Sequence, residues 1–322
     1  MGIEVKRQEH FSAEDWLGYY RLNQAIFQET YPYRDMVSEE QFLRDPRPLF
    51  LMNSGLRCLV LFRNGRMIAL SHYRLDSSHS VCTAEVKFLQ AGFDDLSSKE
   101  MVKTLLAIRD ENQLEILQMI VENAQVVQHY QNTGHFQKVG QVRESVLDLQ
   151  QLDLNLMASW QSQNQGFTLK ALSWNDARDV AALVDIYNES NADVPFQNAV
   201  GMVRTREASY FLDWVARLQV NDMTMPAFGL YCQDQIAGLA LFELRAANPM
   251  TATIIYTGVA RIFRKRGLGR HLKASSTLHL LGIFPGLRFI VTANEETNLP
   301  MLNINIAMGF AVKSEFTMLR YI

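Results

Sequence analysis

Residues 257–273 read Thr257-Gly-Val-Ala-Arg-Ile-Phe-Arg264-Lys-Arg-Gly267-Leu-Gly269-Arg-His-Leu-Lys273, and this stretch carries the most chemical information in the chain. It begins as a strand, passes through a turn and continues as an amphipathic helix that opens with two glycines. Six Arg or Lys residues and no Asp or Glu occur between positions 261 and 273. We expect His271, which lies within this basic helix, to be exposed.

The start of this helix is a candidate anion site. A helix N-terminus presents N–H groups without intrahelical acceptors and about half a positive elementary charge. Glycines let an anion approach the backbone, and neighbouring Arg and Lys side chains add counter-charge. A solvated basic helix start in a tight turn would give the same pattern. The stretch is neither a Walker loop nor G-x-G-x-x-G.

The composition excludes several classes of protein. The 322 residues are 48% hydrophobic and 20% charged, with a formal net charge of -3, which favours packed cores over disorder. Near-neutral charge and the lack of an aromatic-interleaved basic stripe argue against nucleic acid as a partner. No apolar run approaches the roughly 18 residues of a membrane span. The charged start lacks a signal core, so we expect a cytoplasmic protein without membrane association.

The chain divides into two similar halves. Glutamine-rich stretches at 150–151 and 161–166 predict a linker at 151–166 between domains at 1–150 and 167–322. Each half shows helical stretches, a hairpin and then strand–helix units, and the first hairpin turns at Asn64-Gly65. Asn123 lies eleven residues before Gly134, and Asn298 lies eleven before Gly309. We therefore expect a duplicated α/β (α+β) architecture, each domain having a mixed, mostly antiparallel central sheet flanked by helices.

These motifs resemble a known superfamily. Arg264-Lys-Arg-Gly267-Leu-Gly269 is similar to the R/Q-x-x-G-x-G/A signature of the GCN5-related N-acetyltransferases (GNAT). Thr257-Gly258-Val259 resembles the splayed strand of that fold, and residues 298–310 resemble its second conserved block. The resemblance covers roughly 167–322, and the whole chain is similar to tandem-domain members of the mycothiol synthase type.

The resemblance implies acetyl-CoA as co-substrate, held in the second half. The loop amides would hold its pyrophosphate, and Val259 and Arg261 would pair with the pantetheine arm. Asn298 would match the family asparagine near the cofactor. The residues assigned to cofactor binding are Val259, Ala260, Arg261, Arg264, Lys265, Arg266, Gly267, Leu268, Gly269, Arg270 and Asn298.

The first half lacks this loop. Its corresponding stretch, residues 88–99, contains Asp94 and Asp95 and no R-x-x-G-x-G. Carboxylates repel a pyrophosphate and suit helix N-capping. We expect a degenerate first domain that does not bind CoA.

Acetyl transfer needs a neutral amine, a polarised carbonyl and a stabilised leaving thiolate. Many family members donate to the thiolate from a tyrosine four residues before the Gly-Phe pair, where this chain has Asn305. An amide cannot give up a proton, so Tyr256 is the alternative acid. The first half keeps Tyr130 at the corresponding position, where we expect simple packing.

Glu243, in an alternating apolar strand, is the candidate base. An ordinary solvent-facing glutamate would also give this pattern, and Glu295 and Glu296 are rivals for the role. The seven histidines and three cysteines show no ligand spacing, so no metal is expected.

We expect an N-acetyltransferase that moves acetyl from acetyl-CoA to a primary amine of a small molecule or peptide. The alternative is a non-catalytic acyl-CoA-binding or regulatory protein with the same fold, which the asparagine at position 305 permits. The sequence predicts neither the acceptor nor the oligomeric state.

Overall fold

The computed structural model describes residues 2–31, 33, 38–44, 56–89, 92–194, 200 and 205–322. The first half contains β1 (Ile3–Arg7), α1 (Ala13–Thr30), α2 (Glu39–Arg44), β2 (Leu56–Arg63), β3 (Arg66–Asp76), β4 (Val81–Phe88), α3 (Asp95–Glu111), β5 (Ile116–Val121), α4 (Ala124–Asn132) and β6 (Phe136–Asp148). The second half contains α5 (Leu154–Ser162), β7 (Thr168–Leu172), α6 (Ala177–Asn191), α7 (Ala208–Val220), β8 (Met223–Thr224), β9 (Ala227–Cys232), β10 (Gln235–Arg245), β11 (Thr251–Val259), α8 (Leu268–Ile283), β12 (Phe289–Glu295), α9 (Leu299–Met308) and β13 (Ala311–Tyr321).

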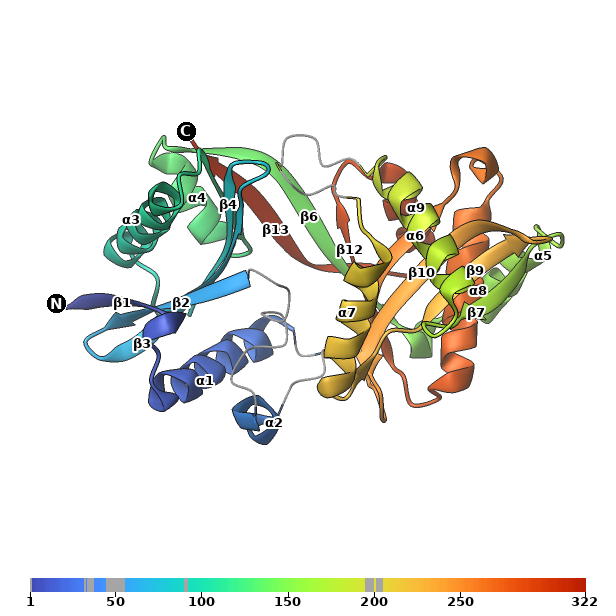
Figure 1. Cartoon of the computed structure of the whole chain (residues 1–322), viewed down its shortest axis with the longest axis horizontal. Helices are drawn as coiled ribbons and strands as arrows, with labels where there is room; N and C mark the ends of the chain where they lie inside the picture. The colour runs from blue at the N-terminus through green and yellow to red at the C-terminus, as the bar shows by residue number, and fades with distance from the viewer. Residues whose placement is uncertain are drawn as a thin grey trace.

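One mixed sheet runs through both halves, in the order β1-β2-β3-β4-β5-β13-β6-β12-β11-β10-β9-β7. The last strand of each half lies next to the other half: β13 pairs with β5, and β6 pairs with β12. Strands β6 and β13 also pair with each other across the middle of the molecule (Figure 1). Each half therefore donates its final strand to the sheet of the other.

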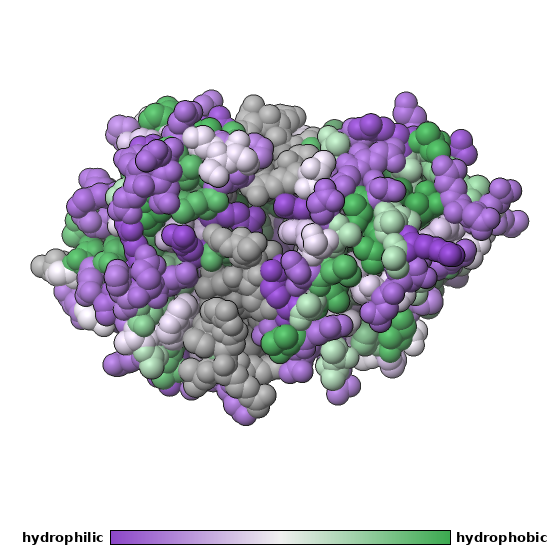
Figure 2. All heavy atoms as spheres, in the orientation of Figure 1, coloured by the Kyte–Doolittle hydropathy of each residue, from purple (hydrophilic) through white to green (hydrophobic). Residues whose placement is uncertain are grey.

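Strands β2, β3 and β10 are buried on both faces along their central residues. In β2, Leu59 and Leu61 belong to the cluster that includes Leu105 of α3, whereas Cys58 and Val60 pack in the cluster of α1. Successive strand residues point to opposite faces, so a strand covered on both sides is apolar throughout. Figure 2 shows hydrophilic residues over most of the visible face of both halves, with hydrophobic residues scattered between them.

The predicted fold class is confirmed, and local signals produce the expected local structure. Asn64 and Gly65 adopt φ values of 49° and 77° at the first hairpin, as a tight hairpin turn requires. The polar stretch expected as a linker contains α5, which packs on α8 and buries Met157 and Trp160. No helix in the described ranges is long and apolar enough to cross a membrane.

Candidate cofactor and transfer site

Two parallel strands separate in the second half. β11 and β12 pair from Thr251 with Phe289 to Ile254 with Thr292, although both strands continue beyond these pairs. In the first half, the parallel strands β4 and β5 pair over the whole length of β5. A gap between parallel strands therefore opens in the second half and not in the first.

The loop that follows β11 exposes backbone donors at the start of α8. Gly267 is the N-cap residue and has φ 75°, and Lys265 has φ 61°. Within the described part of the chain, the N–H groups of residues 265–269 meet no hydrogen-bond acceptor. A Cβ added at Gly269 would lie 3.0 Å from Ile304 Cδ1. The loop thus forms a backbone cradle suited to an anion.

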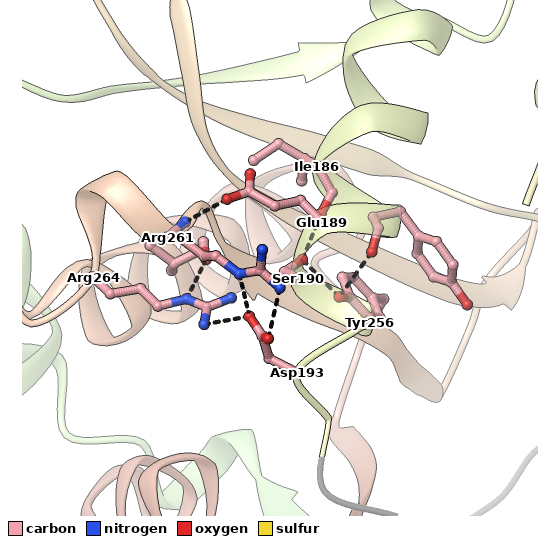
Figure 3. A network of polar contacts seen from close by, with 9 residues as sticks. Ile186, Glu189, Ser190, Asp193, Tyr256, Arg261 and Arg264 are labelled. Carbon is pink, nitrogen blue, oxygen red and sulfur yellow. Dashed lines mark hydrogen bonds and ion pairs between the residues drawn. The ribbon is translucent and has the colours of Figure 1, made fainter. Parts of the chain in front are cut away.

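Two of the basic side chains near this loop are bound by a carboxylate of the loop after α6 (Figure 3). Arg261 makes a bidentate contact with Asp193, at 2.8 Å for both Nε and Nη2. Arg264 Nη1 donates to Asp193 at 2.7 Å. These guanidinium groups hold the pKa of Asp193 well below its ordinary value.

The backbone assigned to pantetheine pairing also has internal partners. The Arg261 N–H donates to Glu189 Oε1 at 2.9 Å, and Arg264 Nε donates to the Val259 carbonyl at 2.9 Å. The Ala260 N–H donates to the Ala237 carbonyl at 3.0 Å. Cofactor pairing at positions 259 and 261 would have to displace the side chains of Glu189 and Arg264.

The remaining basic residues of the stretch divide into exposed and buried ones. Arg266 lies over the Phe263 ring and Arg270 over the Trp160 ring. His271 is 5% exposed, so the expectation that it is exposed was wrong. Its helix is covered by α5 as well as by the sheet, so His271 is buried although the neighbouring Arg270 is exposed.

Tyr256 faces α6. Its hydroxyl lies 2.7 Å from Ser190 Oγ, and the Ser190 hydroxyl in turn donates to the Ile186 carbonyl at 2.5 Å (Figure 3). Ser190 donates its one hydroxyl proton to the Ile186 carbonyl, so it accepts in its contact with Tyr256. The Tyr187 carbonyl, 3.4 Å from the Tyr256 hydroxyl, is a second acceptor on α6. Burial raises the pKa of Tyr256 to about 12. The phenol therefore remains protonated at neutral pH and directs its proton towards α6.

The register of β10 against β11 shows which face of the sheet Glu243 and Tyr256 share. Leu241 pairs with Tyr256 and Glu243 pairs with Thr253, with an irregularity after Leu241 that leaves Ile255 as an extra residue on β11. Directly paired residues project from the same face of a sheet, and positions 241 and 243 share a face. Glu243 and Tyr256 therefore lie on the same side of the sheet, the side of α6.

Asn305 lies on the other side of the sheet, among α8, α9 and β12. It is 1% exposed, and its Nδ2 donates to Asn294 Oδ1 at 2.7 Å. Its Oδ1 accepts a hydrogen bond from Lys273 Nζ. Lys273 is 2% exposed, and burial lowers its pKa to about 7. The sequence pattern grouped Lys273 with the surface cations and gave no signal of its burial.

Three further candidates lie at the end of β12. Asn298 is the N-cap residue of α9 and accepts from the Met301 N–H. Glu295 is 4% exposed and accepts from the Thr297 N–H at 2.6 Å. Glu296 forms an ion pair with Lys138 at 3.1 Å. Each side chain thus has a local structural partner.

The first half fills the corresponding helix start with its own side chains. Asp94 is the N-cap residue of α3, accepts from the Ser97 N–H at 2.8 Å and pairs with Arg63 at 2.6 Å. Tyr130 is 1% exposed and packed in the core of the first half. In the described residues, no three His, Cys, Asp or Glu side chains gather in a way that could hold a metal.

Comparison with solved structures shows the fold. A tandem GNAT protein from the clavulanic acid biosynthesis pathway aligns with a TM-score of 0.73 at 17% identity, over 99% of this chain and 98% of that one. The chain has a tandem GNAT fold. A GCN5-related N-acetyltransferase from Sphaerobacter thermophilus aligns over 99% and 95% of the two chains, with a TM-score of 0.68 at 14% identity.

A glucosamine N-acetyltransferase region of a fungal multi-domain β-N-acetylglucosaminidase also has this GNAT fold. Its TM-score is 0.67 at 11% identity, over 99% of this chain and 38% of that one. No family model matches the sequence, and no curated protein does. The similarity is therefore one of fold.

Proposed function

We propose that the protein is an acyl-CoA-dependent N-acyltransferase that moves acetyl from acetyl-CoA to a primary amine, with its cofactor site in the second half. The observation that carries the proposal is the start of α8. Five backbone N–H groups that meet no acceptor among the described residues follow a strand that has separated from its parallel neighbour. Backbone amides, glycines and cationic side chains are the donors that a pyrophosphate needs.

Residues of this chain would take distinct roles. The amides of 265–269 would hold the pyrophosphate, with Arg266 and Arg270 adding charge at the surface. Bound acetyl-CoA would supply an activated thioester carbonyl. Glu243 would take the proton of the amine on the α6 side of the sheet, where the register places it.

The closed strand pair and the capping carboxylate of the first half support one cofactor per chain. β4 and β5 leave no unpaired stretch of β5, and Asp94 occupies the start of α3. A pyrophosphate there would meet a carboxylate in place of free amides.

The alternative, a non-catalytic acyl-CoA-binding protein, is permitted by the asparagine at position 305, because an amide cannot give up a proton. Asn305 has partners at both ends of its amide, and the proton of Tyr256 is directed to Ser190. Turnover of acetyl-CoA with a panel of amines separates the two functions, because a binding protein would bind CoA and release no free thiol.

The binding site itself is tested by calorimetry with CoA. Gly267→Asp places a carboxylate where the phosphate should lie, and like charges about 4 Å apart at intermediate dielectric repel by roughly 4 kcal/mol. Gly134→Asp is the matched control, because Gly134 has the same φ of 75° and a Cβ there would meet no atom within 4 Å. We expect loss of CoA binding in Gly267→Asp alone; equal affinity in both variants would disprove the site.

A further inference from the structure

Lys273 is a buried cation with no charged partner in the described structure. Its Nζ donates to the amide oxygen of Asn305 and lies 5.1 Å from the centroid of the Phe310 ring. Burial is the cause of its lowered pKa, and no described carboxylate acts on it. Burying an ammonium group without a counter-ion is costly, so the position invites a functional explanation.

The lysine is connected to the place where the parallel strands separate. Asn305 carries its hydrogen bond onward to Asn294, at 2.7 Å. Asn294 is the second residue after Thr292, where the pairing of β12 with β11 ends. A chain of three side chains, Lys273, Asn305 and Asn294, thus leads from the interior of the second half to the strand opening.

We propose that Lys273, acting through Asn305, supplies the positive charge that stabilises the departing thiolate of CoA. This inference rests on the proposed function. It assigns to Lys273 and Asn305 the stabilisation of the thiolate that a tyrosine at position 305 would provide according to the family resemblance. Lys273 is a positioning residue: its ammonium orients the Asn305 amide and adds a favourable charge in a region of low dielectric.

The atoms of the step balance without another reactant. The amine nitrogen forms a bond to the acetyl carbon, the C–S bond breaks, and its electron pair stays on sulfur. The proton that the nitrogen loses passes to the Glu243 carboxylate. Lys273 keeps its proton throughout, because a thiolate beside it favours the ammonium over the neutral amine that burial alone favours above pH 7. Its contribution is therefore electrostatic.

The test measures the pKa of the CoA thiol while CoA is bound to the protein, which requires no acceptor. Thiolate absorbance is recorded between pH 5 and 10 for the CoA complex, and the spectrum of the complex with desulfo-CoA, which lacks the thiol, is subtracted. We expect the intact protein to lower the thiol pKa by about 1 to 3 relative to free CoA, the range for an opposite charge nearby.

Two variants test the origin of that effect. Lys273→Met removes the charge at similar length, and Asn305→Asp places a carboxylate against the ammonium. We expect both to return the thiol pKa to that of free CoA or higher. Lys313→Met, which changes an exposed lysine of β13, should behave like the intact protein.

A thiol pKa that stays lowered in both variants would overturn the role of Lys273, and so would a thiol pKa in the intact protein equal to that of free CoA. Failure of the intact protein to bind CoA at all would instead disprove the proposed function. The two failures are therefore distinguished by the binding measurement that precedes the titration.

Discussion

Replacing Lys273 by methionine should change how the stability of the protein depends on pH. Burial lowers the pKa of Lys273 from 10.5 to about 7. At roughly 1.4 kcal/mol for each pH unit, keeping this ammonium in the folded interior costs about 5 kcal/mol below pH 7. Met has a similar length, fills the same space and carries no charge.

The sign follows from proton binding. Between pH 7 and 10.5 the unfolded chain holds a proton on Lys273 that the folded chain has lost, so folding stability rises with pH in this window. Below pH 7 both states hold the proton and the contribution is constant. The cost that remains at pH 9 is about 2 kcal/mol, so the difference between pH 6 and 9 is roughly 3 kcal/mol.

The methionine variant should lose this dependence. At pH 6 it avoids the cost of the buried charge but leaves the Asn305 oxygen without its donor, a loss of about 1–3 kcal/mol. We therefore expect the variant to be about 2–4 kcal/mol more stable than the parent at pH 6 and close to it at pH 9.

The assay is urea unfolding followed by tryptophan fluorescence at pH 6, 7.5 and 9. Lys313→Met serves as the control because its side chain is exposed. Parallel stability curves for the parent and the Lys273→Met variant across this range would refute the claim that a destabilised ammonium lies in the core.

Three further outcomes are expected. Calorimetry should give one CoA bound per chain, and a stoichiometry near two would contradict the degenerate first domain. Asp193→Asn should tighten CoA binding several-fold and steepen its dependence on salt, because it releases the guanidinium groups of Arg261 and Arg264. Unchanged affinity would show that these cations do not face the cofactor. Tyr256→Phe should lower the free energy of unfolding by about 1 kcal/mol through the lost hydrogen bond to Ser190. Its turnover on an accepted amine should fall less than tenfold. A loss of about 100-fold or more would identify Tyr256 as the general acid.

The sequence by itself predicted the features that depend on neighbouring residues. Asn64-Gly65 forms the hairpin turn because both residues tolerate positive φ. Gly267 begins α8 and Asp94 caps α3, because a helix start needs a particular backbone geometry or a side-chain acceptor. The tandem GNAT fold was predicted from the resemblance of residues 264–269 and 298–310 to that superfamily, together with the duplicated order of elements.

The tertiary structure decided what depends on segments far apart in the chain. The exchange of β6 and β13 between the halves could not be predicted from the sequence. Each last strand could instead have joined the sheet of its own half, where it would have made equivalent backbone hydrogen bonds. Tertiary packing also decided which basic residues of the stretch 261–273 are buried. His271 and Lys273 lie in the interior because α5 and α9 pack on α8 from other parts of the chain. A helix has no solvent-facing side until its neighbours are in place, so one run of cations became both a surface patch and a buried charge beside Asn305.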